Sequence, residues 1–204
     1  MRYGMVIDLE RCIGCNACTI VCKQKNATPP GTFWTKVTTT EEGEYPKAYR
    51  KHLPTLCNHC ENALCAKVCP TGATHKRDDG IVAVDADKCI GCRMCMAACP
   101  YNVRYFNFGG NNTYFPELGE QVPYEKARSD EFVVGTVSKC NFCADRIDEG
   151  NCLTACAQVC PTHARIFGDL DSSEMQSLVD SGATVLHPEK GTKPSVYYLP
   201  LKRS

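Results

Sequence analysis

Sixteen of the chain's 17 cysteines fall into four groups of four that share one spacing pattern. In every group three residues separate the last two cysteines, and in three of the groups proline follows the last one. The groups, called the first to fourth motifs, are Cys12, Cys15, Cys18 and Cys22; Cys57, Cys60, Cys65 and Cys69; Cys89, Cys92, Cys95 and Cys99; and Cys140, Cys143, Cys156 and Cys160. Cys152 is left over, and we interpret it as an ordinary free thiol.

This spacing predicts [4Fe-4S] clusters. Such a cluster takes four cysteine thiolates, and in two-cluster ferredoxins each motif gives three ligands to one cluster and one to the other. The shared cysteine follows the three-residue gap and precedes proline, and Cys69, Cys99 and Cys160 fit that description. Cys22 is followed by Lys23 instead, so we expect the chain to continue there as a helix.

Three other interpretations fit the cysteines less well. A disulfide framework is typical of secreted chains shorter than roughly 100 residues, and this chain has 204. Structural zinc uses two well-separated cysteine pairs and has no use for a further cysteine three residues on. Ordinary buried thiols are scattered through a core, whereas these are regularly spaced.

The first and third motifs belong to a duplicated unit. Aligning residues 8–22 with 85–99 matches the opening aspartates, both Cys-Ile-Gly-Cys runs and the later cysteines. An apolar stretch precedes each motif, at residues 3–7 and 81–84. Gly14 and Gly91 lie inside the two loops, where glycine lets backbone amides approach the cluster sulfurs. We therefore predict a strand, a ligand loop and a short helix in each unit.

Chain separation predicts how the motifs pair. Cys69, which ends the second motif, and Cys89, which starts the third, are only twenty positions apart, as in one compact ferredoxin, so the first and fourth motifs must pair around them. With shared ligands, four sets of iron ligands follow. Set 1 is Cys12, Cys15, Cys18 and Cys160; set 2 is Cys22, Cys140, Cys143 and Cys156; set 3 is Cys57, Cys60, Cys65 and Cys99; set 4 is Cys69, Cys89, Cys92 and Cys95.

These pairings predict an α+β fold of two nested bacterial-type ferredoxin modules with a pseudo-twofold duplication, an aromatic-rich insertion and a C-terminal extension. The expected segments are the first half of the outer module (1–44), the inner module (45–108), an insertion or partner-docking loop (109–138), the second half of the outer module (139–170) and the extension (171–204).

Two of these segments carry more detailed expectations. The aromatic side chains around the insertion either anchor a partner subunit or cap the inner module. In the extension, Asp171 with Glu174 predicts a capping box that opens a helix running to about Ser181, which Gly182 ends.

Several short runs of residues around the motifs resemble those of a known protein family. They are Tyr-Gly-Met-Val-Ile-Asp before Cys12, Cys-Asn-His-Cys at 57, Cys-Pro-Tyr at 99, Lys-Cys-Asn-Phe-Cys at 139, and the tail from Gly191 to Tyr198. With these runs, most of the chain resembles the four-cluster iron-sulfur subunits of respiratory molybdopterin oxidoreductases, of the dimethyl sulfoxide, polysulfide, thiosulfate and arsenate reductase type. Relatives can lose one cysteine and hold a [3Fe-4S] cluster, but here every motif position is cysteine, which implies four [4Fe-4S] clusters.

The resemblance implies a non-catalytic subunit that relays electrons between a large molybdopterin catalytic subunit and a membrane quinol-oxidising subunit or cytochrome. It implies that set 1 faces the catalytic subunit and set 4 the membrane side. The segment around Trp34 and the Leu-Pro-Thr-Leu-Cys run at 53 resemble the arsenate reductase version, and the substrate stays open between arsenate and sulfur compounds. The alternative is a free-standing polyferredoxin that serves soluble redox enzymes.

The composition and the length of the apolar stretches limit which partners and which cellular location we expect. The 23 basic and 23 acidic residues cancel, so we expect no nucleic-acid partner. No stretch approaches the roughly 20 apolar residues of a membrane helix, and a first strand starting by Tyr3 leaves no room for a signal peptide. By resemblance we expect export to the periplasm with a signal-bearing partner; a cytoplasmic location is the alternative.

Three polar residues near the second motif invite a functional interpretation. His59 lies between two cysteines, but the four-cysteine sets are complete without it, so we do not expect it to bind iron. Lys76 and Arg77 either raise the potential of a nearby cluster by their charge or form a solvated turn.

Overall fold

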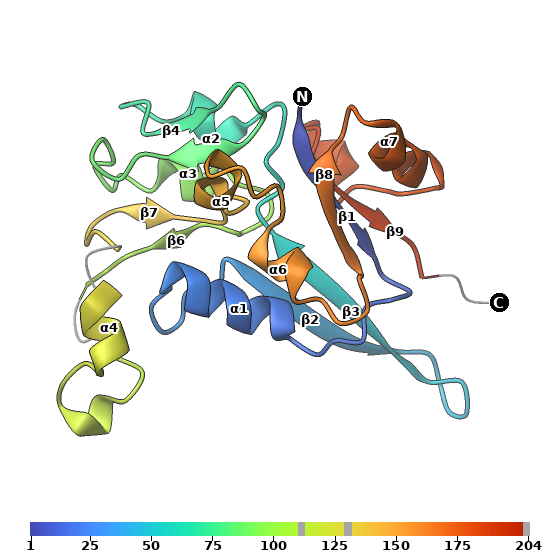
Figure 1. Ribbon diagram of the computed structural model, residues 1–204, viewed down its shortest axis with the longest axis horizontal. Coiled ribbons are helices and arrows are strands. Elements are labelled where there is room, and N and C mark those ends of the chain that lie inside the picture. The colour runs from blue at the N-terminus through green and yellow to red at the C-terminus, as the bar shows by residue number, and fades with distance from the viewer. Residues whose placement is uncertain (110–112, 129–131, 202–204) are drawn as a thin grey trace.

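The computed structural model describes residues 1–109, 113–128 and 132–201 (Figure 1). Its elements are β1 (Tyr3–Asp8), α1 (Ala17–Asn26), β2 (Thr35–Glu42), β3 (Tyr49–Leu56), α2 (Leu64–Lys67), β4 (Thr74–Lys76), β5 (Val82–Val84), α3 (Met94–Ala97), β6 (Tyr105–Phe106), η1 (Pro116–Leu118), α4 (Pro123–Arg128), β7 (Val137–Ser138), α5 (Ala144–Asp148), α6 (Ala155–Gln158), β8 (Arg165–Asp169), α7 (Ser173–Asp180), η3 (Pro188–Lys190) and β9 (Val196–Leu199). This mixture of short helices and small sheets agrees with the predicted α+β class.

The sheet β8-β1-β9 brings together the first strand and two segments near the C-terminus. β1 pairs antiparallel with β8 and parallel with β9, so it is the central strand and is buried on both faces. Because side chains alternate along a strand, Met5 and Ile7 face the main core, whereas Val6 packs with Leu170 and Met175 beneath α7. The strand predicted before the first motif is confirmed.

α1 continues beyond Cys22, as expected from the absence of proline after that cysteine. The helix ends at Asn26, and the backbone of the next residue, Ala27, is left-handed. The helix packs against α6 of the fourth motif. Cys18 and Cys22 are four residues apart and therefore lie on one face of the helix. This face is buried.

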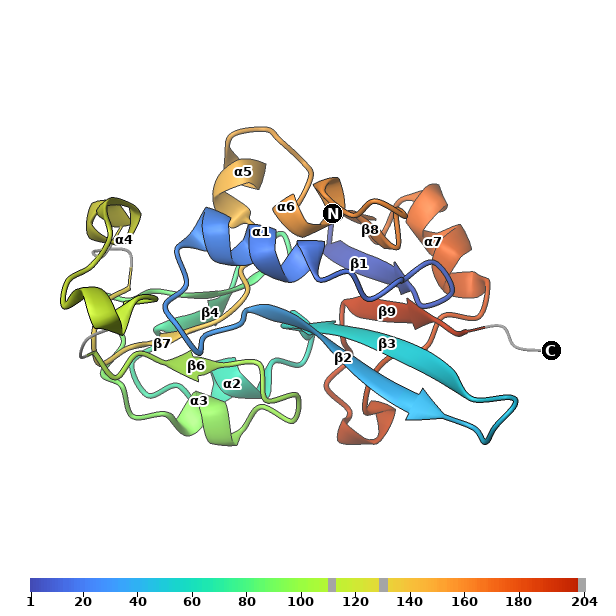
Figure 2. The ribbon, with the colours of Figure 1, turned by 90° about the horizontal axis from the view of Figure 1, so that it is seen from below.

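β2 and β3 form an antiparallel hairpin that the sequence analysis did not predict. Its eight residue pairs run from Thr35 opposite Leu56 to Glu42 opposite Tyr49. The outer end projects from the body of the molecule, as Figures 1 and 2 both show. The inner end is buried at Thr35 and Leu56, and Cys57, the first cysteine of the second motif, follows Leu56 directly.

The second and third motifs lie at the other end of the molecule, around α2, α3 and the hairpin of β4 and β5 (Figure 1). α2 contacts α3 directly, as α1 contacts α6. β5 begins one residue later than the predicted strand at 81–84. The insertion contains α4, which lies at the end of the molecule opposite α7, as Figures 1 and 2 both show.

The C-terminal helix begins one residue later than predicted. The cap of α7 is Ser172, whose hydroxyl accepts from the N–H of Met175, so the predicted capping box of Asp171 and Glu174 is wrong. The helix ends at Asp180, and Gly182 follows with a positive φ of 104°, as expected for a glycine that ends a helix. Within the described ranges, no helix combines the length and the apolar character that crossing a membrane requires.

Candidate iron-sulfur cluster sites

Four cavities are each lined by four cysteines, and their membership matches the four predicted sets. Set 1 lines one cavity, and sets 2, 3 and 4 line one each. In every cavity three cysteines come from one motif and the fourth is the last cysteine of the motif paired with it. The fold thus brings together all sixteen predicted site residues in the predicted groups of four.

Pairs of helices explain why the sets exchange a cysteine. α1 carries Cys18 toward the cavity of set 1 and Cys22, one turn later, toward that of set 2. Across from it, Cys156 on α6 lines the cavity of set 2, and Cys160 just after the helix lines that of set 1. α2 and α3 repeat the arrangement for sets 3 and 4. A spacing of four residues therefore moves a ligand from one cavity to the next.

The two loop glycines have the backbone conformation that the duplicated unit predicted. Gly14 has a φ of +70° and Gly91 a φ of +67°, a region that favours glycine. Neither position has room for a side chain: a Cβ on Gly14 would clash with the His52 ring, and one on Gly91 would clash with the carbonyl oxygen of Gly135. The ligand loops are therefore packed closely against neighbouring segments.

Several thiols receive hydrogen bonds. The N–H of Thr74 donates to the Sγ of Cys69 at 3.3 Å, and the N–H of Ala164 donates to the Sγ of Cys160 at 3.3 Å. Burial opposes ionisation of both thiols, but these and neighbouring donors outweigh it and hold the pKa of Cys69 and of Cys160 below the usual value. These donors favour a thiolate, which is the form that binds iron.

More deeply buried thiols show the opposite shift. Burial raises the pKa of Cys22 to about 12 and that of Cys60 to about 12. A buried thiolate therefore needs a compensating positive charge, which an iron ion supplies when it binds. Four of the sixteen thiols, on Cys18, Cys57, Cys140 and Cys156, belong to the main hydrophobic core.

These features together fit a [4Fe-4S] cluster in each cavity. The four thiols are the ligand set that such a cluster takes, and hydrogen bonds to its cysteine sulfurs are a recognised way to adjust its potential. In the described part of the chain, no three or more His, Cys, Asp or Glu side chains are grouped as a site for a single metal ion.

Two buried arginines lie beside the cysteine sets, and the sequence analysis did not single them out. Arg165 lines the cavity of set 1 and donates to the Sγ of Cys156, in set 2, at 3.6 Å. Arg104 lines the cavity of set 3 and donates to Thr74, beside set 4, at 3.2 Å. The available signal was positional, because each arginine follows the last cysteine of its motif by five residues.

A third buried cation, Lys139, stands between sets 2 and 3. Its ammonium group donates to the carbonyl oxygen of Cys140 at 2.8 Å and to that of Val82. Cys140 belongs to set 2, and Val82 lines the cavity of set 3. Lys139 therefore joins the backbone segments that border these two cavities.

The structure gives the other polar residues near the second motif structural roles. His59 is buried beside set 3, and its Nδ1 accepts a hydrogen bond from the N–H of Val82 at 3.1 Å. Burial, followed by the charges of Lys139 and Arg104, holds the pKa of His59 well below its usual value. Arg77 pairs with Asp79 at 2.9 Å and also with Asp148 of α5.

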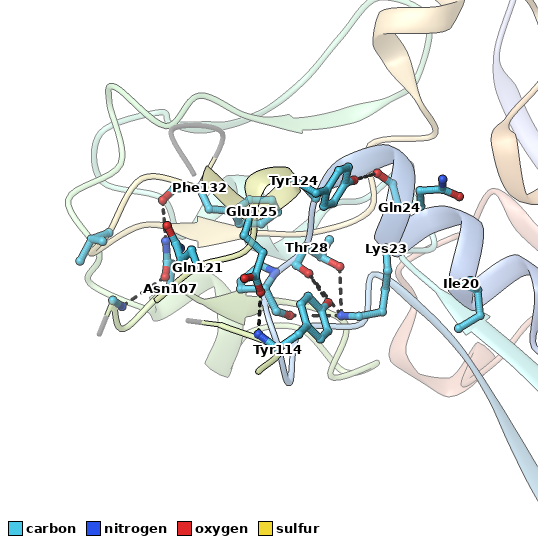
Figure 3. A pocket seen from close by; sticks show the side chains of 14 residues that line it. Ile20, Lys23, Gln24, Thr28, Asn107, Tyr114, Gln121, Tyr124, Glu125 and Phe132 are labelled. Atoms are coloured by element: carbon cyan, nitrogen blue, oxygen red, sulfur yellow. Dashed lines mark hydrogen bonds between the residues drawn. The ribbon is translucent and has the colours of Figure 1, made fainter. Parts of the chain in front are cut away.

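The left-over cysteine and the insertion also have defined positions. Cys152 is exposed, and its Sγ lies 3.8 Å from the Tyr3 hydroxyl. A cavity of about 460 Å³, lined by no cysteine, separates the insertion from α1 (Figure 3). At its border Tyr114 donates to the carbonyl oxygen of Thr28 at 2.7 Å, and Tyr124 donates to that of Gln24. These two aromatic residues therefore cap the end of α1 rather than the inner module.

Family models agree with this arrangement. A model described as a 4Fe-4S dicluster domain matches residues 49–114 and 110–170, and a second model of the same description matches residues 11–73. Together with the four cavities, these matches define a ferredoxin-like iron-sulfur protein.

Relatives narrow the class. A Halobacterium salinarum protein provisionally named as an iron-sulfur subunit of dimethyl sulfoxide reductase is 46% identical over 97% of this chain and 79% of its own length. The arsenate respiratory reductase iron-sulfur subunit of a Shewanella species is 40% identical over 98% of this chain and 96% of its own. A subunit of the selenate reductase of Mesobacillus selenatarsenatis is 41% identical over 98% and 72%. The chain belongs to the family of iron-sulfur subunits of molybdopterin oxidoreductases. Such subunits transfer electrons and are the non-catalytic partners of molybdenum-containing catalytic subunits.

Proposed function

We propose that this chain holds four [4Fe-4S] clusters and relays electrons between a molybdopterin catalytic subunit and a membrane quinol-oxidising subunit or cytochrome. The observation that carries the proposal is the lining of four separate cavities by four cysteines each. When bound, each cluster accepts and gives up one electron. The chain itself supplies the ligands, the spacing between the sites and the exclusion of water from them.

The proposed ligand sets are the four predicted ones, and they divide the chain into two nested ferredoxin modules. The outer module holds sets 1 and 2, and the inner module holds sets 3 and 4. Packing of α1 on α6 supports the outer module, and packing of α2 on α3 supports the inner one. The same crossing of ligands in both pairs supports a pseudo-twofold duplication.

The sites follow one another in the order of their numbers. Arg165 connects sets 1 and 2, Lys139 connects sets 2 and 3, and Arg104 connects sets 3 and 4. One buried residue thus links each set to the next in number, which favours transfer along a line over transfer to a single hub.

Exposure supports entry and exit at the two ends of this line. Cys15 in set 1 and Cys92 in set 4 are exposed, whereas all four cysteines of set 2 are buried and set 3 has none that is exposed. Beside each exposed cysteine lies an isoleucine that is mostly exposed, Ile13 near set 1 and Ile90 near set 4. Apolar side chains at an exposed redox site suit contact with a partner protein.

By family resemblance, the catalytic subunit docks at set 1 and the membrane partner at set 4. We propose the periplasm as the location, reached together with a partner that carries the export signal. The relatives are named for arsenate, selenate and tetrathionate reductases, among others. For this chain we propose a catalytic subunit of the arsenate or sulfur-compound type.

Anaerobic affinity purification from the native host tests the proposal. Molybdenum, iron and sulfide are assayed on the purified material, and about sixteen irons per chain are expected from four cubane clusters. A large molybdenum-containing subunit that co-purifies supports the relay, and arsenate, polysulfide and thiosulfate are then tried as oxidants. A solitary chain with the full iron content supports the free polyferredoxin instead, and a colourless chain without sulfide contradicts both.

A further inference from the structure

Two arginines occupy equivalent places in the two halves of the molecule. Arg104 follows Cys99 by five residues, and Arg165 follows Cys160 by five residues. Both side chains are at least nine-tenths buried, with exposed fractions of 5% and 4%. After their Cys-Pro pairs the third-motif and fourth-motif segments share this arginine and the phenylalanine two residues later, Phe106 or Phe167, while the residues between differ. A buried arginine at the same place in both segments indicates a shared requirement.

Arg165 lies between sets 1 and 2. Its side chain lines the cavity of set 1, while its Nη2 donates to the Oγ1 of Thr35 at 2.9 Å and its Nη1 lies 3.6 Å from the Sγ of Cys156. Thr35 and Cys156 both line the cavity of set 2. One guanidinium group thus borders both sites of the proposed outer module.

Arg104 lies between sets 3 and 4 in the same manner. Its side chain lines the cavity of set 3, and its Nη1 donates to the Oγ1 of Thr74 at 3.2 Å. Thr74 lines the cavity of set 4 and donates its N–H to the Sγ of Cys69. In each module the arginine lines one cavity, and a threonine hydroxyl from the lining of the other cavity accepts its hydrogen bond.

Neither arginine has a carboxylate partner among the residues that the structure describes. Their hydrogen bonds go to hydroxyl groups and sulfur atoms, and the buried Nη2 of Arg104 has no partner in the described ranges. A buried charge without a counter-ion strongly destabilises the folded state. Arg77, by contrast, pairs with two aspartates. The remaining source of negative charge near both arginines is the cysteine thiolates.

The thiolates favour the charge on both arginines. Arg165 interacts electrostatically with Cys156 of set 2 and Cys18 of set 1. Arg104 interacts in the same way with Cys65 of set 3 and Cys95 of set 4. Each arginine is thus close to one cysteine from either of two sets.

We propose that each buried arginine is a counter-charge shared by the two clusters of one module, Arg165 by sets 1 and 2 and Arg104 by sets 3 and 4. The inference rests on the proposed function, because it requires clusters in these sets. An electron that arrives from a partner adds one negative charge to a site, and no bond forms or breaks. A guanidinium group at the boundary stabilises that added charge in either site, so it raises both reduction potentials and keeps the pair close in potential.

The test uses the iron-loaded protein, purified anaerobically with any subunits that accompany it. Arg165→Met and Arg104→Met remove the charge but keep a long side chain, and Arg165→Lys and Arg104→Lys keep the charge. Arg50→Met is the matched control, because it removes one positive charge from the exposed end of the β2–β3 hairpin. All variants are titrated with redox mediators while the electron paramagnetic resonance signals of the clusters are recorded.

Each Met variant is expected to lower two of the four reduction equilibrium constants at least tenfold, which is about 59 mV for one electron. Arg165→Met should shift the potentials of sets 1 and 2, and Arg104→Met those of sets 3 and 4. A variant that carries both changes should shift all four. The potentials of the Lys variants and of Arg50→Met should stay near those of the wild type. If a Met variant loses iron, Arg→Gln variants replace it. Two outcomes would overturn the inference. In the first, variants that lack the charge keep their full iron content and all four reduction potentials. In the second, one single-site variant shifts all four potentials.

The wild-type protein separates this result from failure of the proposed function. If it lacks about sixteen irons per chain, the four-cluster proposal fails before the arginines are considered. If it holds them and the charge-removing variants leave the potentials unchanged, only the counter-charge inference fails.

Discussion

The imidazole ring of His59 stacks on the phenyl ring of Phe142, with the centroids 3.7 Å apart and 18° between the planes. The two residues hold the same place in the second and fourth motifs, directly before the second cysteine. Both are almost fully buried, and Phe142 also meets Phe167 of β8 edge-on. The stack therefore joins the ligand loop beside set 3 to the ligand loop beside set 2.

Removing this contact is expected to loosen the junction between the two loops. Phe142→Ala leaves a cavity in the main core and should cost about 3–5 kcal/mol of stability. The thermal midpoint of the iron-loaded protein measures the effect. Phe108→Ala is the control, because Phe108 is 73% exposed, and its midpoint should fall much less. Equal losses in the two variants would show that the stack does not stabilise the fold.

Cys160→Ala tests the sharing of ligands between motifs. If Cys160 completes set 1, its loss should alter the same cluster signal as Cys12→Ala, giving a three-iron cluster or none. If it belongs with the other cysteines of its own motif, it should match Cys156→Ala instead. Electron paramagnetic resonance and iron content distinguish the two results. Cys152→Ala is the control and should leave the iron content unchanged, because Cys152 lines none of the four cysteine-lined cavities.

Gly91→Ala should be more damaging than Gly31→Ala. Both glycines have positive φ, so alanine costs roughly 1–2 kcal/mol of backbone strain at either position. A Cβ on Gly91 would also meet the carbonyl oxygen of Gly135, whereas one on Gly31 would meet nothing within 4 Å. Thermal midpoints measured side by side isolate the clash from the strain. A larger loss at Gly31 would contradict the packing of the third-motif loop.

Ser172→Ala should weaken α7 by about 1 kcal/mol, because its hydroxyl accepts from the N–H of Met175 and caps the helix. Asp171→Ala removes the residue that the sequence pattern proposed as the cap and should weaken the helix less. Hydrogen exchange of the α7 amides measures both effects. The reverse order would restore the capping box of Asp171 and Glu174.

Removal of iron is expected to unfold much of the protein. Four cysteines belong to the main core, and the free energy of cluster binding is part of the free energy of folding. An oxidant with a chelator should abolish the near-ultraviolet circular dichroism and the protease resistance together. Anaerobic addition of iron and sulfide should restore both. A chelated protein that keeps its protease resistance would show that the polypeptide packs without its clusters.

The cysteine sets and the course of α1 could be predicted from the sequence because they depend on short-range chemistry. Cysteines at regular gaps predict cluster ligands, and the absence of proline after Cys22 predicts the continuation of α1, which the structure has. The division into four sets followed from the same spacing, and those cysteines line common cavities. Binding of iron by each set stays a prediction. The capping box failed by one residue, since Asp, Ser and Glu are all acceptable near a helix start.

The sequence by itself predicted which cysteines line a common cavity, because the ligand count and loop geometry of a cluster limit the spacings that a chain can use. Only the tertiary structure decided what lies between the sites. The stack of His59 on Phe142 and the burial of Arg104 and Arg165 both depend on contacts between segments far apart in the chain. No local pattern encodes such contacts, since the burial of a charge is set by the packing around it.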